Sequence, residues 1–509
     1  VGCFFFFFFF FFIATAIFDA PGIRFRQPPF TAEVVRAALN PLPAPADAQP
    51  QRGAGQAAAT HAPPAAARWP RRKHWWAAAG ALLAGVAGFA AGTLGWRAAI
   101  APVARADTSM YTAATLERGR QLAAVGNCVG CHTAPGGPPN AGGLAMETPF
   151  GPIHTTNLTP DVETGIGAWS LAAFQRAMRE GISRDGRHLY PAFPYTSYTR
   201  TSDEDLTALY AWLMSQTSVR RETAPTRLAF PYGMRPLMAL WNALFLQPGA
   251  VTQADPSRSA QWNRGEYLVN GLGHCGACHT ERNFLGAERS GTAYLGGAMV
   301  KGWDAPALTS ASRAPVPWTE DAFYRYLRDG HSPQHGAASG PMAPVVAELA
   351  ALPDEDLRAM AHYLASFNPS VSEAEAEAEA QAAILEARAS ALTSARAAPG
   401  AASRMFEVAC GACHHDGDGP HLLGVNTPLA LNSNLHAERP DNLVRVILEG
   451  IQAPATRAIG FMPAYAQALD DRQVAELAAW MRQRYAPGKP PWSDLEQAVA
   501  RVRASPSQP

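Results

Sequence analysis

The pattern of apolar and polar positions along the chain predicts the same set of three helices three times. Each set begins with a helix that leads into a cysteine pair, continues with an amphipathic helix that stops at a glycine, and closes with a helix that starts on acidic residues. Glycine is a usual helix stop. Aspartate suits a helix start because its side chain caps free backbone N–H groups and its negative charge interacts favourably with the helix dipole. The amphipathic helices are expected at residues 169–181, 318–330 and 441–450. The closing helices are expected to start at Asp203, Asp354 and Asp470.

These repeats predict a mostly α protein made of small modules in tandem, joined by segments of different character. A stretch rich in Pro and aromatics follows the first module, and an Ala/Glu-rich stretch without Gly or Pro, expected to be helical, follows the second. The expected modules are module 1 (residues 108–222), module 2 (residues 258–368) and module 3 (residues 403–487). The expected connections are a linker at 223–257, a helical linker at 369–402 and a loose, Pro-rich tail at 488–509.

Residues 1–74 match no folded element. Phe4 to Phe12 form an unbroken phenylalanine run, and the chain from Pro41 to Pro70 is rich in Ala and Pro and poor in large apolar residues. Such composition is typical of disorder. Since Met110 is the first methionine, the segment is expected to be either a disordered extension or sequence upstream of the true translation start.

A membrane anchor is expected immediately afterwards. The segment Trp75 to Trp96 carries no charge, is long enough to cross a bilayer as one helix, and has Trp at both ends. The basic residues 71–74 place its N-terminal side in the cytoplasm. The alternative is a cleaved signal peptide with a small-residue site at Ala104 to Ala106. In both cases the modules are expected on the periplasmic side of a bacterial inner membrane.

Three short cysteine motifs carry the candidate chemistry. Each reads Cys-x-x-Cys-His, the attachment signature of c-type haem. Residues three apart share one face of a helical turn, so both thiols can reach the two vinyl groups of one porphyrin. The following histidine is then placed to ligate the iron. The three sets are Cys128, Cys131 and His132; Cys275, Cys278 and His279; and Cys410, Cys413 and His414.

One such motif alone could equally be half of a zinc site or a thioredoxin-type redox pair. Three copies, each with its trailing histidine and each inside its own module, favour haem over both alternatives. The sequence therefore predicts a cytochrome that carries three haem c groups.

Composition narrows the class further. The 509 residues have a formal net charge of zero, which gives no electrostatic case for a nucleic-acid partner. Six of the seven cysteines belong to the motifs, so the chain does not have the framework of a disulfide-rich secreted protein. The seventh, Cys3, receives no role.

Methionines at a fixed offset predict the sixth iron ligands of two modules. Met342 lies 12 residues after Gly330, and Met462 lies 12 residues after Gly450, each on a loop rich in Pro and Gly. A lone methionine is more often core filler, but two at the same offset favour thioether ligation opposite His279 and His414.

The same count in module 1 ends on a residue that cannot bind iron. Phe193 lies 12 residues after Gly181. The first haem is therefore expected to have either an open sixth position or another ligand. Met146 and His188 stay open as alternatives, whereas Met178 lies on the amphipathic helix and is expected to pack in the core.

From Arg118 to Tyr485 the chain resembles the membrane-anchored triple-haem cytochrome c subunits of bacterial periplasmic dehydrogenases. The matching segments are TPFG at 148–151, TNLTPD at 156–161, GIGAW at 165–169, NRG at 263–265 and HCGACHT at 274–280. The resemblance implies three tandem class-I-like cytochrome c domains after one N-terminal transmembrane helix. It also implies electron transfer from the large subunit of a periplasmic dehydrogenase to membrane ubiquinone or a terminal cytochrome oxidase.

The loop around Phe193 indicates a branch of that family. The segments PAFPY at 191–195, SAQWNRG at 259–265 and GPMAP at 340–344 look like those of cytochromes that accompany molybdenum hydroxylases, such as nicotinate and aldehyde dehydrogenases. The alternatives are the cytochrome subunit of a quinoprotein alcohol dehydrogenase or of a flavin sugar dehydrogenase. No acid–base constellation is visible, so the chain is not expected to be catalytic alone, unless an open first haem forms a peroxidase-like site.

Overall fold

A computed structural model of the protein describes Gly85 and residues 97–249, 254–394, 400–415, 424–425 and 427–505. All of them belong to one of the two units into which the chain divides, Trp76–Pro509. The expected extension at 1–74 and the expected span at 75–96, Gly85 apart, lie outside the described residues. Within the described ranges, no helix combines the length and the apolar character that crossing a bilayer requires.

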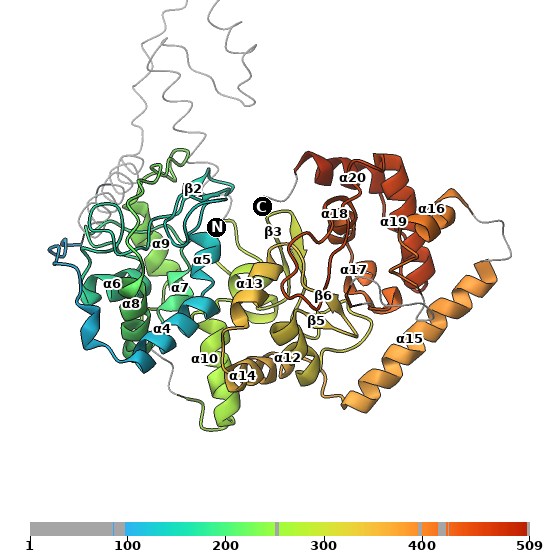
Figure 1. Cartoon of the computed structure of the whole chain (residues 1–509), viewed down its shortest axis with the longest axis horizontal. Helices are drawn as coiled ribbons and strands as arrows, with labels where there is room; N and C mark the ends of the chain where they lie inside the picture. The colour runs from blue at the N-terminus through green and yellow to red at the C-terminus, as the bar shows by residue number, and fades with distance from the viewer. Residues whose placement is uncertain are drawn as a thin grey trace, which may run out of the picture. The chain divides into compact units, whose positions relative to one another are not determined.

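Module 1 consists of helices joined by long loops, drawn in blue to green in Figure 1. It contains η1 (Thr108–Met110), α4 (Ala113–Val125), α5 (Cys128–Cys131), β1 (Ala145–Met146), β2 (Ile153–His154), α6 (Leu171–Glu180), α7 (Tyr195–Tyr198) and α8 (Asp203–Ser215). The linker after it forms α9 (Leu237–Phe245). The strands β1 and β2 pair antiparallel, with Ala145 opposite His154.

Module 2 has a similar order of helices and contains two strand pairs in place of one. It contains α10 (Ala260–Asn270), α11 (Gly276–His279), η2 (Gly291–Ala293), β3 (Ala298–Val300), β4 (Trp303–Ala305), α12 (Glu320–Asp329), β5 (His331–Ser332), β6 (Gly336–Ala337), α13 (Met342–Leu349) and α14 (Asp354–Ala365). The strands pair antiparallel as β3–β4 and β5–β6, with Val300 opposite Trp303 and Ser332 opposite Gly336.

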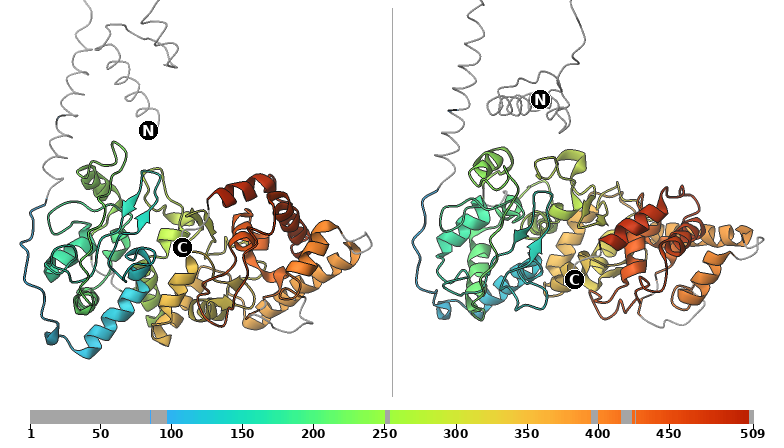
Figure 2. Two further views of the ribbon diagram at one scale, coloured as in Figure 1. Left: turned by 45° about the horizontal axis from the view of Figure 1, so that its top comes forward. Right: turned by 90° about the horizontal axis from the view of Figure 1, so that it is seen from above.

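The expected helical linker is present, and module 3 follows it. The remaining elements are α15 (Glu373–Ser394), α16 (Ala401–Ala409), η3 (Leu429–Leu431), α17 (Ser433–His436), α18 (Asp441–Glu449), α19 (Asp471–Tyr485) and α20 (Leu495–Ala504). The linker helix α15 contacts α19, and the two lie side by side in orange and red in Figure 2. The described chain is mostly helical, as the sequence predicts.

The amphipathic helices end where the sequence places their ends. Gly181, Gly330 and Gly450 follow α6, α12 and α18 with φ of 63°, 72° and 68°, a left-handed conformation that suits glycine. At the other end, the side chains of Ser170 and Thr319 accept hydrogen bonds from the first turns of α6 and α12. Local signals therefore determine these helices.

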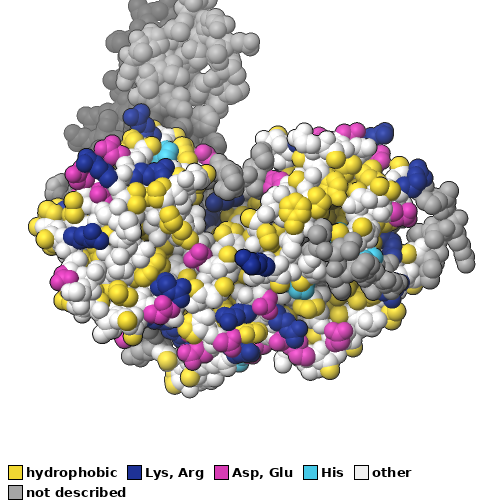
Figure 3. Space-filling model, viewed as in Figure 1, with side chains coloured by type: hydrophobic (Ala, Val, Ile, Leu, Met, Phe, Trp, Pro, Cys, Tyr) yellow, Lys and Arg dark blue, Asp and Glu magenta, His cyan; other side chains and the backbone are white. Residues whose placement is uncertain are grey.

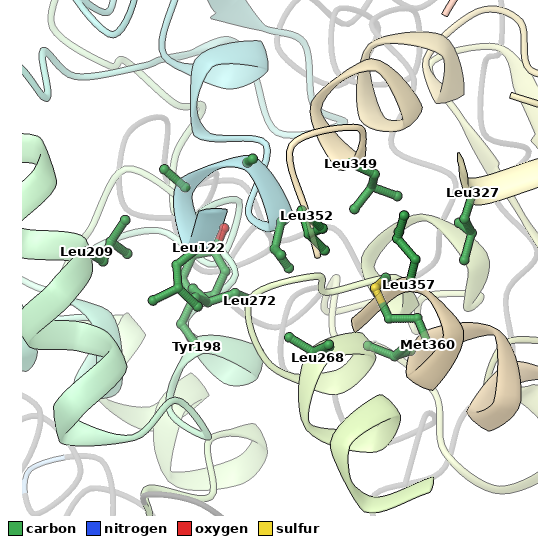
Figure 4. Packing of buried hydrophobic residues seen from close by; sticks show 14 of the residues in the cluster. Leu122, Tyr198, Leu209, Leu268, Leu272, Leu327, Leu349, Leu352, Leu357 and Met360 are labelled. Carbon is green, nitrogen blue, oxygen red and sulfur yellow. The ribbon is translucent and has the colours of Figure 1, made fainter. Parts of the chain in front are cut away.

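The core is divided between the modules in an unexpected way. One cluster of buried residues draws members from both module 1 and module 2, and a second belongs to module 3. Figure 4 shows Leu122 of α4 close to Leu272 and Leu352 of module 2. Burying such side chains contributes about 1.5–3 kcal/mol each, so modules 1 and 2 stabilise each other. The division of the chain into three separate domains stays a prediction.

The prediction of a loose tail at 488–509 is wrong for the part that forms helix α20. Helix α20 packs against α18 and α19, and it buries Ala498, Val499 and Val502. These residues recur at helical spacing and form an apolar stripe. This apolar stripe is short and follows a Pro-rich stretch, so the sequence analysis did not recognise it as a helix.

Candidate haem-attachment sites

The three cysteine motifs adopt the same backbone turn. In each, the N–H of the motif histidine donates to the carbonyl oxygen of the first cysteine, at 2.9 Å in modules 1 and 2 and 2.8 Å in module 3. The bond closes one helical turn, so two thiols and one imidazole project from neighbouring positions. The pairs are His132 with Cys128, His279 with Cys275, and His414 with Cys410.

The imidazoles of modules 1 and 2 are held through Nδ1. In His132, Nδ1 is 2.6 Å from the carbonyl oxygen of Thr156, and in His279 it is 2.7 Å from that of Pro306. A carbonyl only accepts, so each Nδ1 carries the hydrogen and Nε2 keeps its lone pair. A carbonyl that binds the far ring nitrogen in this way orients a metal-ligating histidine. In His414, Nδ1 is buried and has no hydrogen-bond partner within the described residues.

The surroundings suit neutral ligands. Burial lowers the pKa of His132, His279 and His414, so each imidazole is neutral at pH 7 and can bind a metal. Burial also raises the pKa of Cys128 and Cys275 to about 12. Reactive thiol pairs have lowered pKa values, so these cysteines do not resemble a thioredoxin-type redox site.

The donor set fits a covalently attached haem better than zinc. All six motif cysteines are free thiols, two per turn, and each pair lies next to one imidazole, whose Nε2 keeps its lone pair in modules 1 and 2. No group of three or more His, Cys, Asp or Glu side chains is arranged to hold a metal ion among the residues that the structure describes. Two thiols for the vinyl groups and one imidazole for the iron are the groups that haem c requires.

The loops that follow α6 and α12 fold back identically, which bears on the sixth ligands. The N–H of Leu189 donates to the carbonyl of Gly181 at 2.7 Å, and the N–H of Ala338 donates to that of Gly330 at 2.7 Å. The residues four places further on are Phe193 and Met342. The two therefore occupy equivalent positions in the fold, and both pack against the shared core.

Phe193 is embedded among aromatic rings. Its ring lies 5.3 Å from that of Tyr198, edge-on, and 6.4 Å from that of Tyr195. Of the other candidates in module 1, Met178 is buried in the shared core, as expected for packing. His188 is also buried, and Met146 lies half-buried on β1.

Module 3 presents its methionine from a different loop. Met462 pairs with Ile451 in a short antiparallel bridge, with N–H to O distances of 2.9 and 3.2 Å in the two directions.

Apolar side chains near this loop and near the third motif are exposed. Phe461, next to Met462, is 47% exposed, and Val408, two residues before the third motif, is 87% exposed. Figure 3 shows hydrophobic side chains gathered on the module 3 part of the face.

The first two motifs lie close together. Burial raises the pKa of both Cys131 and Cys278, and the nearby thiol of Cys131 adds to the rise at Cys278. Lys301, in the turn between β3 and β4, partly offsets the effect of burial on both thiols. Tyr198 bridges the two sites: the charges of the module 1 thiols contribute to its raised pKa after burial, and its ring meets His274 at 5.5 Å. His274 of module 2 therefore packs against Tyr198 of module 1.

A part-buried ionic cluster joins modules 1 and 2, and the sequence analysis did not predict it. Arg118 binds both oxygens of Asp205 at 3.0 Å, and Arg264 binds both oxygens of Asp356 at 2.7 and 2.8 Å. Arg118 also reaches Asp356 across the modules at 3.3 Å, and the hydroxyl of Tyr267 donates to Asp205 at 2.7 Å. We call these five residues the Arg–Asp cluster.

The helices that carry the cluster cross at glycines. A Cβ atom at Gly119 of α4 would lie 2.1 Å from the carbonyl oxygen of Ala208 in α8, and one at Gly265 of α10 would lie 2.0 Å from that of Ala359 in α14. Only glycine permits so close an approach. The repeated Arg-Gly pair and the repeated Asp-Glu-Asp were visible in the sequence as the signals of this arrangement.

Known protein families match two parts of the chain. Residues 116–217 match the model described as Cytochrome c, and residues 397–481 match the model described as Cytochrome C oxidase, cbb3-type, subunit III. Together with the three turns, these matches define a c-type cytochrome.

Individual relatives are more informative. A nicotinate dehydrogenase subunit of Pseudomonas putida is 54% identical over 97% of this chain, which spans 40% of that relative's length. The fructose dehydrogenase cytochrome subunit of Gluconobacter japonicus is 35% identical over 77% of this chain and 84% of its own. The cytochrome c subunit of the quinone alcohol dehydrogenase of Gluconobacter oxydans is 36% identical over 75% of this chain and 82% of its own length. The chain belongs to the family of cytochrome c subunits of dehydrogenases.

Proposed function

We propose that this protein relays electrons for a dehydrogenase through three haem c groups, one on each motif. The observation that carries the proposal is the same hydrogen-bonded turn, found three times, which presents two thiols and one imidazole. The proposed iron ligands are His132 in module 1, His279 with Met342 in module 2, and His414 with Met462 in module 3. The modules correspond to cytochrome c domains at 108–222, 258–368 and 403–487.

The chain's own residues attach and orient the groups. Bound haem c supplies an iron that takes up and releases one electron at a time. The carbonyl oxygens of Thr156 and Pro306 fix the ring planes of His132 and His279. The closeness of Cys131 to Cys278 supports direct exchange between modules 1 and 2.

The relatives and the resemblance support the proposed partner, and the uncharged segment 75–96 supports the proposed location. The name of the Pseudomonas putida relative, together with the loop around Phe193, supports a molybdenum hydroxylase large subunit that oxidises an aldehyde or an N-heterocycle. The electron acceptor is ubiquinone or a terminal oxidase. The segment 75–96 anchors the chain in the bacterial inner membrane, with the modules in the periplasm.

The ligand assignment can be tested with matched substitutions of methionine by leucine, which preserve volume. Met342→Leu and Met462→Leu are each expected to lower one haem potential by roughly 0.1 V or more, because thioether ligation raises the potential within the ~0.8 V range that axial ligands set. Met178→Leu is the control and leaves all potentials unchanged. A redox titration in which Met342→Leu and Met462→Leu both behave like Met178→Leu would refute the assignment.

A second function is favoured by one observation, the presence of Phe193 where module 2 has Met342. An iron without a sixth protein ligand is able to bind peroxide or another small molecule, which would make module 1 a catalytic site. Carbon monoxide binding distinguishes the two functions. A spectral change that Phe193→Met abolishes supports a ligand-binding site, and a first haem that is low-spin and unresponsive supports relay alone.

A further inference from the structure

Half of the exposed large apolar side chains in the described chain gather in one region, around α9. Leu240 and Leu244 are 62% and 61% exposed, one helical turn apart on α9. Phe230 is 86% exposed in the turn before the helix, and Phe284 is 89% exposed on a loop of module 2. Tyr232, Met234 and Leu285 complete the set. We call these seven residues the α9 surface.

The α9 surface is continuous because its parts contact one another. The indole nitrogen of Trp241, on the inner side of α9, donates to the carbonyl oxygen of Leu285 at 3.0 Å. The ring of Tyr232 lies 4.4 Å from that of Phe150, which in turn lies beside Gly286. Two loops and a helix thus expose apolar groups together.

Helix α9 reverses the usual design of a surface helix. A helix of a water-soluble protein turns charged residues outwards, whereas Leu237–Phe245 contains no charged residue. Its inner side is packed and hydrogen-bonded to the protein, because Trp241 is buried and the side chain of Asn242 donates to the carbonyl oxygen of Glu180 at 3.2 Å. Leu240 and Leu244 nevertheless leave most of their side chains exposed, and apolar groups exposed in this way mark an interaction surface.

The position of Arg97 indicates what covers this surface. Arg97 directly follows the segment 75–96, and its N–H donates to the carbonyl oxygen of Gly186 at 3.3 Å. The loop from Glu180 to His188 also holds α9, through Asn242 and through Arg235, whose guanidinium donates to the carbonyl oxygen of His188 at 2.6 Å. One loop thus binds both Arg97, at the end of the proposed anchor, and the residues that hold α9 in place.

We infer that the α9 surface lies on the lipid bilayer that the anchor crosses; this rests on the anchor of the proposed function. If the span ends at Trp96, one residue of chain, at most ~3.6 Å, separates Arg97 from the membrane interface. Apolar side chains on an uncharged helix then enter the boundary between headgroups and acyl chains, as interfacial helices do. The contact fixes the orientation of modules 1 and 2 on the membrane.

Spin labelling of the full holoprotein tests this contact. Leu244→Cys carries a nitroxide at the α9 surface, and Leu385→Cys, an equally helical leucine of α15 that is 54% exposed, is the control. Both are made with Cys3→Ser, since the motif cysteines are occupied by haem. The protein is inserted into vesicles of phosphatidylethanolamine and phosphatidylglycerol, and collision of the label with oxygen and with a water-soluble nickel complex is measured.

The expected result is a several-fold higher ratio of oxygen to nickel accessibility at position 244 than at position 385, in vesicles only. Protein that floats with the vesicles while both labels stay equally open to nickel contradicts the lipid contact and leaves the anchor intact. Protein that does not float contradicts both, although its haem content and potentials still test the electron relay. A label at 244 that is shielded only when the dehydrogenase subunit is added assigns the surface to that protein instead.

Discussion

Modules 1 and 2 differ from module 3 in how they are held. The first two share one core and the Arg–Asp cluster, whereas module 3 has a core of its own. Module 3 meets module 2 through a small apolar cluster that includes Val316 and Leu431, and through polar contacts such as the reciprocal 2.8 Å bonds between the side chain of Asn442 and the backbone of Asp304. In α19 the place of the cluster aspartate is taken by Gln473, which caps the start of the helix, and its neighbour Arg472 pairs with Glu476 on the surface.

The difference shows what the repeated Arg and Asp accomplish. Burial opposes the charge on Arg118, but the hydrogen bond and charge of Asp205, together with those of Asp356, raise its pKa. A buried charge is tolerated when it is paired, and here the pairs cross the module boundary. Two of the cysteine-motif turns are thereby held together by shared contacts, and we expect the third, in module 3, to unfold separately from them.

The largest expected effect comes from removing the aspartate that both arginines share. Asp356→Ala leaves Arg264 and Arg118 short of a buried carboxylate, and we expect a loss of about 3–5 kcal/mol of unfolding free energy from modules 1 and 2. Module 3 should keep its stability. Denaturant titration with module-resolved hydrogen exchange measures both.

Arg472→Ala is the matched control in module 3, and its exposed pair should contribute less than about 1 kcal/mol. Equal losses from Asp356→Ala in all three modules would show that they form a single cooperative unit.

Acid should destabilise modules 1 and 2 and module 3 to a similar extent. Burial lowers the pKa of His335 in module 2 and of His436 in module 3 to about 4 from 6.5. The unfolded chain therefore binds more protons between these values, so stability is full above pH 6.5 and is lost as the pH falls towards 4. Each unit is expected to lose about 3 kcal/mol.

The pH dependence can be assigned by measuring unfolding at several pH values for single variants. His335→Gln should flatten the profile of modules 1 and 2 and leave that of module 3 sloping, and His436→Gln should do the reverse. Profiles that keep their slopes in both variants would contradict the assignment.

A smaller loss is expected where α10 crosses α14. Gly265→Ala brings a Cβ atom against the carbonyl oxygen of Ala359 and forces the helices apart, at a cost of about 2 kcal/mol. Gly488→Ala, where a Cβ meets no atom within 4 Å, is the control. Thermal unfolding that is the same for both variants would show that the crossing relaxes freely.

The smallest effect concerns a single bond across the modules. Tyr267→Phe removes the hydroxyl that donates to Asp205 and should cost about 1 kcal/mol. In a double-mutant cycle with Asp205→Asn, we expect the two losses to be less than additive, because both act on one contact. Full additivity would place Tyr267 outside the Arg–Asp cluster.

The sequence predicted what depends on neighbours along the chain. The helices ending at Gly181 and Gly330 were predictable because capping and apolar period are local signals. Counting from these glycines also put Phe193 and Met342 at one position, and equivalent backbone bonds confirm the match.

Features that require distant residues to meet were missed. Arg118 and Asp356 are 238 positions apart, so nothing local shows that they form a pair. The shared core and the short strand pairs have the same origin, since tertiary contacts create them. Helix α20 was missed for another reason: its apolar stripe of Ala498, Val499 and Val502 is brief and follows a run of prolines.

The most direct test of the central claim is to count the haems and their methionine ligands in one preparation. Intact mass of the mature protein should show three covalent haems, and magnetic circular dichroism should show the thioether-to-iron charge-transfer signal from two of the three irons. Met342→Leu and Met462→Leu should each remove half of that signal. Fewer than three haems, or a methionine signal from every iron, would contradict the account.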